Sequence, residues 1–439
     1  MHVPIRDPET STVANDSSGF GILAGVLIPG RGQPISKAAL IVKDDIIEWV
    51  GPESEIPAQY QTFGFSRIPV LMPGMWDVHT HFMGADIVAP VTNFVPSFLP
   101  GTAALIGAVT VDDLRATLMA GFTSVRELGG YAGDVFPAVE KGAIVGPNVY
   151  SSMGILGITG GHSDIHELPL STVKHGCSLG VPTQVCDGVD GCTSAVRQMV
   201  RRGAKVIKIC STGGVLSLND QPEDSQFSPA ELRAIVEEAA RSSRVVASHA
   251  IGKNGIMAAL DAGVKTIEHG MYVDEEVISK MKEKDAILVP TRHIVEGLAA
   301  GAEDLPPKVR VKVERLLQLS RDSLKLAVKR RLKIALGTDT FSSDRKHAIS
   351  HGKNAKELLY AIEAGMLPLE AIEMATAIPP ETLGRQARRA GQLRAGYDAD
   401  MIAISKSPLE NIEILTNPDN VTHVWKAGVL YKSPPVSFV

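Results

Sequence analysis

Two histidines separated by one residue, His79 and His81, are the first side chains whose type and spacing suggest chemistry. They end the stretch Pro73-Gly74-Met75-Trp76-Asp77-Val78-His79-Thr80-His81, which follows an apolar run. Because successive side chains on a β-strand point to opposite faces, these two imidazoles point to the same face. Two imidazoles on one side of a strand end form half of a divalent-metal site. The same two histidines could instead be partly exposed polar residues at a strand end. The metal hypothesis therefore requires further ligands elsewhere in the chain.

Further metal-capable residues follow other apolar segments, namely Lys208, His249, His269 and Asp339. A lone histidine on an apolar strand is commonly a satisfied core or surface residue, and Asp339 alone suits a helix N-cap. Lys208 is less ordinary, because an ammonium buried within an Ile-Lys-Ile strand is costly unless it is paired. Either it forms an ion pair with a nearby carboxylate, or its neutral amine takes up CO2 to form a carbamate. A carbamate offers two oxygens to two metals.

The segment that must position these residues, 73–385, alternates short apolar strands with stretches of helical periodicity. This alternation is typical of βαβ units and a parallel sheet. Strands are predicted at 74–80, 123–126, 148–152, 206–210, 245–249, 266–269, 287–290 and 333–337. We therefore expect an α/β fold, a TIM (β/α)8 barrel in which the chemistry lies at the C-terminal ends of the strands. An open doubly wound sheet is the alternative, but no Gly-x-Gly-x-x-Gly motif opens a first helix.

Helices are predicted between most of these strands. Ser228 and Glu231 have the spacing of a capping box at the start of one of them. The predicted helices span 190–202, 229–242, 254–262, 274–284, 307–329 and 354–364.

The two ends of the chain contain short strands without helices between them. Residues 20–72 form a predicted meander that is too small to stand alone, and residues 386–439 supply further strands. We expect the two ends to assemble one small β-sandwich, into which the barrel is inserted. Residues 1–19 are polar and are expected to form a flexible arm.

The composition excludes several classes of partner. The 439 residues are 44% hydrophobic and 21% charged, which is typical of a packed core, and the net charge is -5. This charge provides no reason to expect nucleic acid or an acidic membrane as a partner. No apolar run is long enough to span a bilayer, and the N-terminus lacks an apolar signal-peptide core, so a cytoplasmic location is expected. The four cysteines match neither a zinc motif nor a disulfide framework.

The motifs together resemble the amidohydrolase superfamily, and more closely its prolidase-like and ochratoxinase-like branch. The similarity covers about residues 20 to 432. Besides 73–81, the matching stretches are Thr-Ser-Val-Arg-Glu-Leu-Gly-Gly (123–130), Gly-Pro-Asn-Val-Tyr-Ser-Ser (146–152), Thr-Gly-Gly-His-Ser-Asp (159–164), Val-Ile-Lys-Ile-Cys-Ser-Thr-Gly-Gly-Val (206–215), Gln-Phe-Ser-Pro-Ala-Glu-Leu (226–232), Ile-Glu-His-Gly (267–270), Leu-Gly-Thr-Asp (336–339) and Tyr-Asp-Ala-Asp (397–400).

This resemblance implies a dinuclear site, and Zn2+ is the expected ion. His79, His81 and Asp339 would bind one metal, and His249 and His269 the other. A carboxylated Lys208 would bridge the two ions. A hydroxide shared by the metals would then attack an amide carbonyl, and Asp339 would pass its proton to the leaving nitrogen. No Gly-x-Ser-x-Gly motif supports a serine nucleophile.

Substrate contacts are assigned on weaker grounds. His162 resembles the family residue beside the metals that contacts the scissile carbonyl or the substrate carboxylate; a loop histidine that caps its own turn is the alternative. Arg126 suits either a carboxylate or a structural salt bridge, and Tyr272 and His293 are further pocket candidates. Relatives commonly carry His-x-His after strand five, whereas Ile251 replaces the second histidine here. The segment Cys177–Cys192 is expected to be a variable loop over the mouth of the site.

We therefore expect hydrolysis of an amide next to a C-terminal amino acid, as in N-acyl amino acids and ochratoxin-type amides. The alternatives are a prolidase-like dipeptidase, a ring-opening or deaminating hydrolase, and a non-catalytic oligomeric scaffold. Assembly as a homo-oligomer is expected from the resemblance alone.

Overall fold

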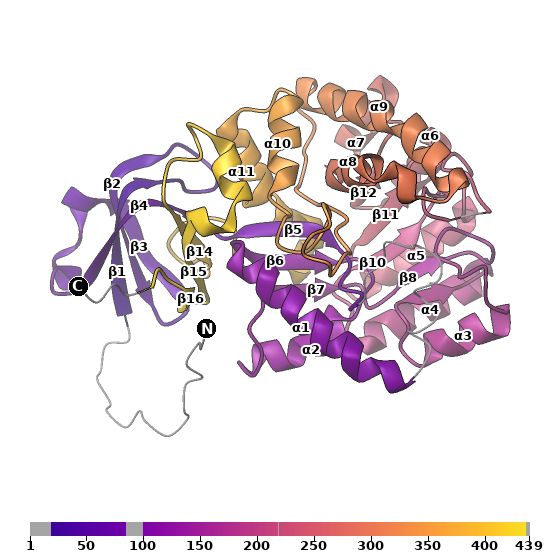
Figure 1. The fold of residues 1–439 in the computed structure, drawn as a ribbon, viewed down its shortest axis with the longest axis horizontal. Coiled ribbons are helices and arrows are strands. Elements are labelled where there is room, and N and C mark those ends of the chain that lie inside the picture. The colour runs from indigo at the N-terminus through magenta and orange to yellow at the C-terminus, as the bar shows by residue number, and fades with distance from the viewer. Residues whose placement is uncertain (1–18, 85–99, 218, 436–439) are drawn as a thin grey trace.

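Strands from both ends of the chain share one sheet in the computed structural model, which describes residues 19–84, 100–217 and 219–435. The strand order is β16-β15-β14-β4-β1-β2-β3, so N-terminal and C-terminal strands meet where β14 pairs with β4 (Figure 1). Hydrogen bonds join all seven strands into a single sheet, so the two-layered sandwich remains a prediction. The predicted flexible arm lies outside the described residues, except for Gly19, which begins β1. The seven strands are β1 (Gly19–Leu27), β2 (Ile35–Lys43), β3 (Ile46–Pro52), β4 (Phe65–Pro73), β14 (Met401–Ile404), β15 (Val421–Lys426) and β16 (Val429–Lys432).

The remaining strands form two parallel sheets, as the βαβ pattern predicted. The smaller has the order β5-β6-β7, and the larger β13-β12-β11-β10-β8-β9. Their strands are short and almost wholly buried, as expected for a parallel sheet covered by helices. Their bounds are β5 (Met75–Thr80), β6 (Phe122–Glu127), β7 (Asn148–Ser151), β8 (Ile155–Gly157), β9 (Thr183–Val185), β10 (Ile207–Cys210), β11 (Val246–Ala250), β12 (Thr266–His269) and β13 (Ile287–Val289).

The predicted strand at 333–337 is wrong in detail, because this segment forms isolated bridges and not a named strand. Ile334 bridges to Leu288 of β13, and Thr340 bridges to Thr80 of β5. The segment therefore links the two parallel sheets without regular pairing. A Cβ added at Gly337 would lie 2.3 Å from Val289 and 2.9 Å from His79, so the backbone passes too close to its neighbours for a larger residue. Closure of a complete eight-stranded barrel remains a prediction.

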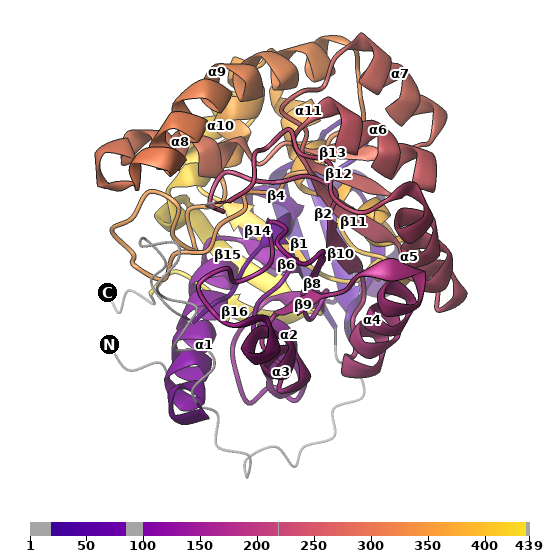
Figure 2. The same cartoon turned by 90° about the vertical axis from the view of Figure 1, so that its right-hand side faces the viewer.

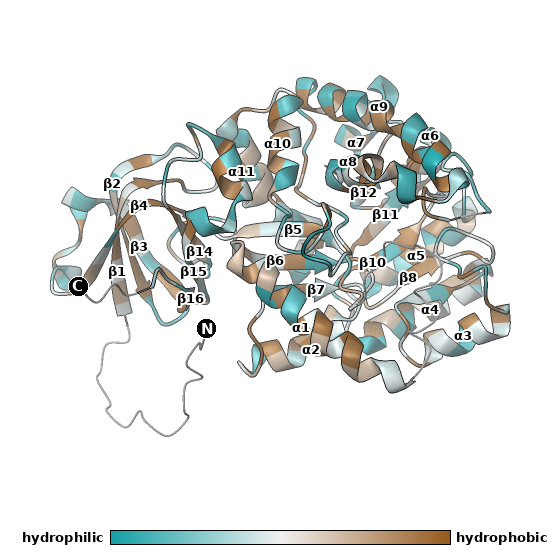
Figure 3. Ribbon diagram, viewed as in Figure 1, coloured by the Kyte–Doolittle hydropathy of each residue, from teal (hydrophilic) through white to brown (hydrophobic). Residues whose placement is uncertain are grey.

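Helices surround the parallel strands, as Figure 2 shows. Outer helices such as α9 carry both hydrophilic and hydrophobic residues, whereas strands such as β1 and β4 are mainly hydrophobic (Figure 3). The capping box of Ser228 and Glu231 is confirmed at the start of α5. None of the described helices combines the length and apolar character that a bilayer crossing requires. The helices are α1 (Ala103–Met119), α2 (Ala132–Glu140), α3 (Leu170–Ser178), α4 (Gly188–Arg202), α5 (Pro229–Arg241), α6 (Lys253–Ala262), α7 (Glu275–Glu283), α8 (Arg292–Ala300), α9 (Pro307–Lys329), α10 (Lys356–Glu363) and α11 (Pro368–Ala375).

The segment Cys177–Cys192 was expected to be a variable loop over the mouth of the site, but much of it is regular secondary structure. It contains the end of α3, strand β9 and the start of α4. Only part of it, Val181 to Thr183, lines the cavity described below. β9 pairs in parallel with β8, so this segment belongs to the edge of the larger sheet.

Candidate metal centre

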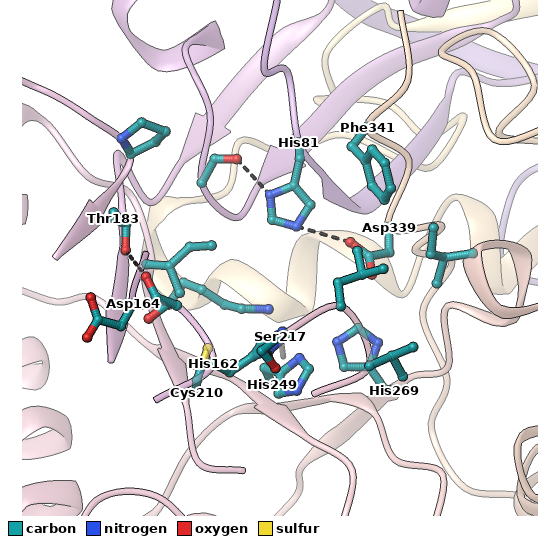
Figure 4. A pocket seen from close by; sticks show the side chains of 18 of the residues that line it. His81, His162, Asp164, Thr183, Cys210, Ser217, His249, His269, Asp339 and Phe341 are labelled. Atoms are coloured by element: carbon teal, nitrogen blue, oxygen red, sulfur yellow. Dashed lines mark hydrogen bonds and ion pairs between the residues drawn. The ribbon is translucent and has the colours of Figure 1, made fainter. Parts of the chain in front are cut away.

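Three predicted ligands meet at the end of β5. The potential ligand atoms of His79, His81 and Asp339 all lie within 4.8 Å of one another. Asp339 Oδ1 is 3.1 Å from His81 Nε2 and 3.5 Å from His79 Nε2, and Figure 4 shows His81 and Asp339 facing each other. Asp339 has φ 58°, in the left-handed region that aspartate tolerates better than most residues. Its N–H donates to His79 O at 2.7 Å, which fixes the turn beside the strand.

A buried carboxylate, Asp77, ties the two halves of this group together. Its Oδ1 accepts from the backbone N–H of His79 at 3.0 Å and of Thr338 at 3.1 Å. Its Oδ2 accepts from Thr338 Oγ1 at 2.6 Å and Asn354 Nδ2 at 2.7 Å. Burial raises the pKa of Asp77 to about 6 against the opposing effect of these hydrogen bonds. Asp77 therefore positions residues on both sides of the candidate site without being a ligand itself.

The outer nitrogen of each histidine in this group has an acceptor. His79 Nδ1 lies 2.8 Å from Glu268 Oε2, and His81 Nδ1 lies 2.7 Å from Gly129 O. Such bonds place the proton on Nδ1 and leave the Nε2 lone pair for a metal. Glu268 is the important residue that sequence reasoning missed, although an acid inside a buried strand signals a hidden partner.

That partner is Arg126, which is fully buried with Glu268. Arg126 Nη2 lies 2.7 Å from Glu268 Oε1, Nη1 donates to Thr266 Oγ1 at 3.1 Å, and Nε donates to Val78 O at 2.5 Å. Burial lowers the pKa of Arg126, and the Glu268 charge opposes this. The residue is not among those that line the cavity, so of its two predicted roles the geometry supports the structural salt bridge.

The other predicted ligands lie across the cavity from His81. The ring centroids of His249 and His269 are 4.5 Å apart, and those of His79 and His269 are 5.1 Å apart. His269 Nδ1 lies 2.7 Å from Thr291 Oγ1, which leaves Nε2 for a metal. His249 differs, because its Nε2 lies 3.0 Å from Gly213 O and leaves Nδ1 as the ligand atom.

Lys208 lies between these two groups, with Nζ 3.3 Å from His79 Nε2 and with 2% of its surface exposed. Burial lowers its pKa, and the carboxylates of Glu268 and Asp339 oppose this only in part. A neutral amine is the form that reacts with CO2. The predicted ion pair with a carboxylate is not found among the described residues at salt-bridge distance.

The donor set fits divalent metal ions. Burial lowers the pKa of His79, His249 and His269 well below the usual value, so these imidazoles are neutral and able to coordinate. Burial alone would raise the pKa of Asp339, but His79 and His81 hold it below its usual value, so it is ionised. Neutral imidazoles beside an ionised carboxylate are nitrogen and oxygen donors that divalent metal ions accept.

His162 lines the same cavity and stacks on His249, with ring centroids 4.2 Å apart. An apolar wall also lines this cavity and comes from α8 and from the segments that follow several of the strands. It consists of Met83, Val215, Leu216, Ile251, Met271, Ile294, Val295, Leu298 and Phe341. Ile251 thus contributes a hydrophobic surface at the position where the family resemblance led us to expect a second histidine.

Two other predicted pocket residues do not line the cavity. The hydroxyl of Tyr272 donates to Glu223 Oε1 at 2.5 Å. His293 is 1% exposed, because the buried Glu357 accepts the backbone N–H groups of Arg292 and His293 and thereby fixes the start of α8. The next residues of that helix, Ile294 and Val295, reach the cavity instead.

Comparison with known proteins identifies the family of this chain. Residues 70–430 match the amidohydrolase family. The ochratoxinase of Aspergillus niger is 46% identical over 430 residues, covering 94% of this chain and 87% of the relative. A crystal structure of A. niger ochratoxinase superimposes with a TM-score of 0.89 at 43% identity, covering 96% of this chain and 98% of that one. A Xaa-Pro dipeptidase with bound methionine in its active site superimposes with a TM-score of 0.82 at 29% identity, covering 95% and 100%. The chain therefore belongs to the amidohydrolase family, and it is a hydrolase that acts on amide bonds.

Proposed function

We propose that this amidohydrolase is a dinuclear zinc enzyme that releases a C-terminal amino acid from an N-acyl amino acid. The observation that carries the proposal is the convergence of four imidazoles and the carboxylate of Asp339 around the buried amine of Lys208. The cavity is lined by these groups and by a cluster of apolar side chains. A substrate with one amide bond and a large apolar substituent complements such a cavity.

His79, His81 and Asp339 would hold one ion, and His249 and His269 would hold the other. Lys208, carboxylated on Nζ, would bridge them. When bound, two zinc ions would supply Lewis acidity that polarises an amide carbonyl and lowers the pKa of water toward about 7. We infer that Asp339 accepts the proton of the attacking water and delivers it to the leaving nitrogen, because an amine departs only when it is protonated. The ionised state of Asp339 suits the first of these steps.

We infer that the two parallel sheets and the segment 333–340 close into a (β/α)8 barrel over residues 73–385. The backbone bonds that support closure are Ala335 N to Leu288 O at 3.0 Å and Val78 N to Leu336 O at 2.9 Å. We also infer that residues 20–72 and 386–439 form the accompanying β-sandwich, and that the protein is a homo-oligomer.

The relatives favour two related substrates. Ochratoxinase is the relative with 46% identity, and by its name acts on ochratoxin, which supports an N-acyl amino acid with an aromatic acyl group. A prolidase complexed with N-methylphosphonate-L-proline, 30% identical, supports a Xaa-Pro dipeptide as the second candidate. We favour the first, because Ile251 and the residues of α8 make the wall apolar.

A substrate panel tests the proposal. Purified enzyme is assayed on ochratoxin-type amides, on N-benzoyl and N-acetyl amino acids with varied C-terminal residues, and on Xaa-Pro dipeptides. We expect the aromatic N-acyl amino acids to be cleaved fastest, about two zinc ions per chain by elemental analysis, and loss of turnover with a chelator. Preference for Xaa-Pro substrates would favour the second candidate. Undiminished hydrolysis by metal-free protein would reject the mechanism.

A further inference from the structure

A buried lysine on α9, Lys312, interrupts an otherwise apolar helix face. Its neighbours Val309 and Val313 are buried in an apolar cluster, whereas Lys312 itself is 4% exposed. Lys312 Nζ donates to three backbone carbonyls, those of Gly214 at 2.9 Å, Ser217 at 2.7 Å and Asp220 at 2.7 Å. An ammonium has three protons, so this geometry uses all of them. Burial of this charge is tolerated because each of its protons has an acceptor. The three carbonyls belong to one loop, which is thereby gathered around a single cation.

The same loop holds the side chain of Asp220, which is 5% exposed. Its Oδ1 accepts the hydroxyl of Ser217, and its Oδ2 accepts from Gln226 Nε2 at 3.1 Å. Lys312 Nζ lies 3.7 Å from Oδ1 and balances the carboxylate charge. The Gln226 carboxamide also accepts the backbone N–H of His162 at 3.2 Å. The loop after β10 is thereby tied to the loop after β8.

Ser217 links this arrangement to the cavity, because its Oγ lies 2.8 Å from His162 Nδ1. A serine hydroxyl has one proton. Asp220 is its close acceptor, whereas the alternative acceptor, Gly214 O, is 3.5 Å away. Ser217 Oγ must therefore accept from His162, so the proton lies on Nδ1. Nε2 is then the ring nitrogen that meets a ligand; it accepts in the neutral ring and donates in the protonated ring.

Close packing also restricts the imidazole ring of His162. A Cβ added at Gly214 would lie 2.1 Å from His162 Cε1 and 2.3 Å from Nδ1. His249 stacks on the imidazole at 4.2 Å between ring centroids, and Figure 4 shows Ser217, His162 and His249 together. Contact with Gly214 and stacking on His249 restrict translation of the ring, and the bond to Ser217 restricts its rotation.

We propose that Lys312, Asp220 and Ser217 form a positioning chain that orients His162, holds its proton on Nδ1 and presents Nε2 to the substrate. None of the three is a ligand of the candidate metals, and Lys312 does not line the cavity. The chain therefore acts through His162. Its kinetic consequence rests on the proposed function, whereas the position of the proton does not.

The first experiment is a double-mutant cycle with the zinc-loaded enzyme and its best amide substrate. We expect Ser217→Ala and Lys312→Met each to lower kcat/KM by about 10- to 100-fold, as for other residues that orient a functional histidine. In the His162→Asn background, either substitution should change kcat/KM by less than about 2-fold, because the imidazole through which Ser217 and Lys312 act is gone. Ser217→Thr keeps the hydroxyl and should retain activity. Lys308→Met, at an exposed position one turn earlier on α9, is the matched control. Zinc content and thermal unfolding are measured for every variant.

The second experiment observes the ring directly by NMR of protein labelled with 15N-histidine, with His162→Asn used for assignment. We expect Nδ1 to carry the proton in the wild type, and this preference to be lost in Ser217→Ala. A wild-type ring protonated only on Nε2 would overturn the proposal. Losses of equal size in the wild-type and His162→Asn backgrounds would also overturn it, because they indicate a purely structural role. Failure to hydrolyse N-acyl amino acids would reject the proposed function and leave the NMR result to decide this inference.

Discussion

Replacement of Glu268 by glutamine tests whether a residue outside the ligand set controls metal binding. The glutamate accepts from His79 on one oxygen and from Arg126 on the other. A carboxamide has one oxygen and one NH2 group, so it cannot serve both partners. If its oxygen faces the guanidinium, its NH2 faces His79 Nδ1 and removes the proton from that nitrogen. The proton of the neutral ring then moves to Nε2, which is the atom required by the metal.

The magnitude follows from these contacts. Loss of an outer acceptor of a ligand histidine typically weakens metal binding about 10- to 100-fold, which is about 1.4–2.7 kcal/mol. Glutamine is uncharged, so the buried Arg126 loses its counter-charge whichever way the carboxamide faces, which typically costs about 3–5 kcal/mol of stability. The positive guanidinium favours the orientation in which the carboxamide oxygen faces Arg126 and the NH2 group faces His79. We therefore expect weaker zinc binding together with a loss of stability.

Zinc retained against increasing chelator measures the first effect, and urea unfolding of the metal-free protein measures the second. Glu127→Gln is the matched control, since Glu127 is also fully buried but accepts from Ala132 N, Gly133 N and Ser151 Oγ. It should lose stability without a change in zinc affinity. Zinc affinity at the wild-type value in Glu268→Gln would refute the reasoning, as would an equal loss in both variants.

Further predictions concern the ligands, the pH dependence and the apolar wall. Lys208→Ala should lose zinc and turnover, and added short carboxylic acids should restore part of the rate by replacing the carbamate; no restoration would count against the bridge. Asp339→Asn should keep much of its zinc by elemental analysis while kcat falls about 10²- to 10⁴-fold; a wild-type rate would exclude Asp339 as the proton carrier. Burial raises the pKa of Glu357 from 4.5 to about 8, so between these values the folded protein binds more protons than the unfolded chain. Its contribution to the free energy of unfolding should fall with rising pH by up to about 1.4 kcal/mol per unit, and urea unfolding of Glu357→Gln at pH 5 to 8 should show a flatter profile. Leu298→Asn should weaken binding of aromatic acyl substrates in the transition state by about 1–3 kcal/mol, which lowers kcat/KM, without loss of zinc. Equal losses for acetyl substrates would show that this wall does not contact the acyl group.

The positions of the candidate ligands could be predicted from the sequence because they obey local rules. Strand alternation places His79 and His81 on one face, and the carboxyl ends of parallel strands gather residues that are distant in sequence. Helical periodicity and the Ser228 capping box are local in the same sense, and the corresponding helices lie within a few residues of their predicted bounds.

The supporting residues could not be found in this way, because their partners lie far away in the chain. His79 and Glu268 are 189 residues apart, and Lys312 is 92 residues from Asp220. A partial signal did exist for Arg126, since two buried charges of opposite sign on central strands are expected to pair. That argument favours a salt bridge with Glu268 over a substrate contact. The irregular backbone at 333–340 is also determined by tertiary contacts, because Gly337 must pass close to Val289 and His79.

Under the proposed function, metal binding and substrate choice depend on separate parts of the molecule. The outer acceptors of the ligand histidines come from different segments: Glu268 for His79, Gly129 for His81, Gly213 for His249 and Thr291 for His269. A change in any one of them disturbs a single ligand, and the remaining ligands still hold the site together. The apolar wall supplies none of these acceptors. Substitutions in this wall, at Leu298 for example, should therefore change which amide is cleaved while zinc affinity stays constant.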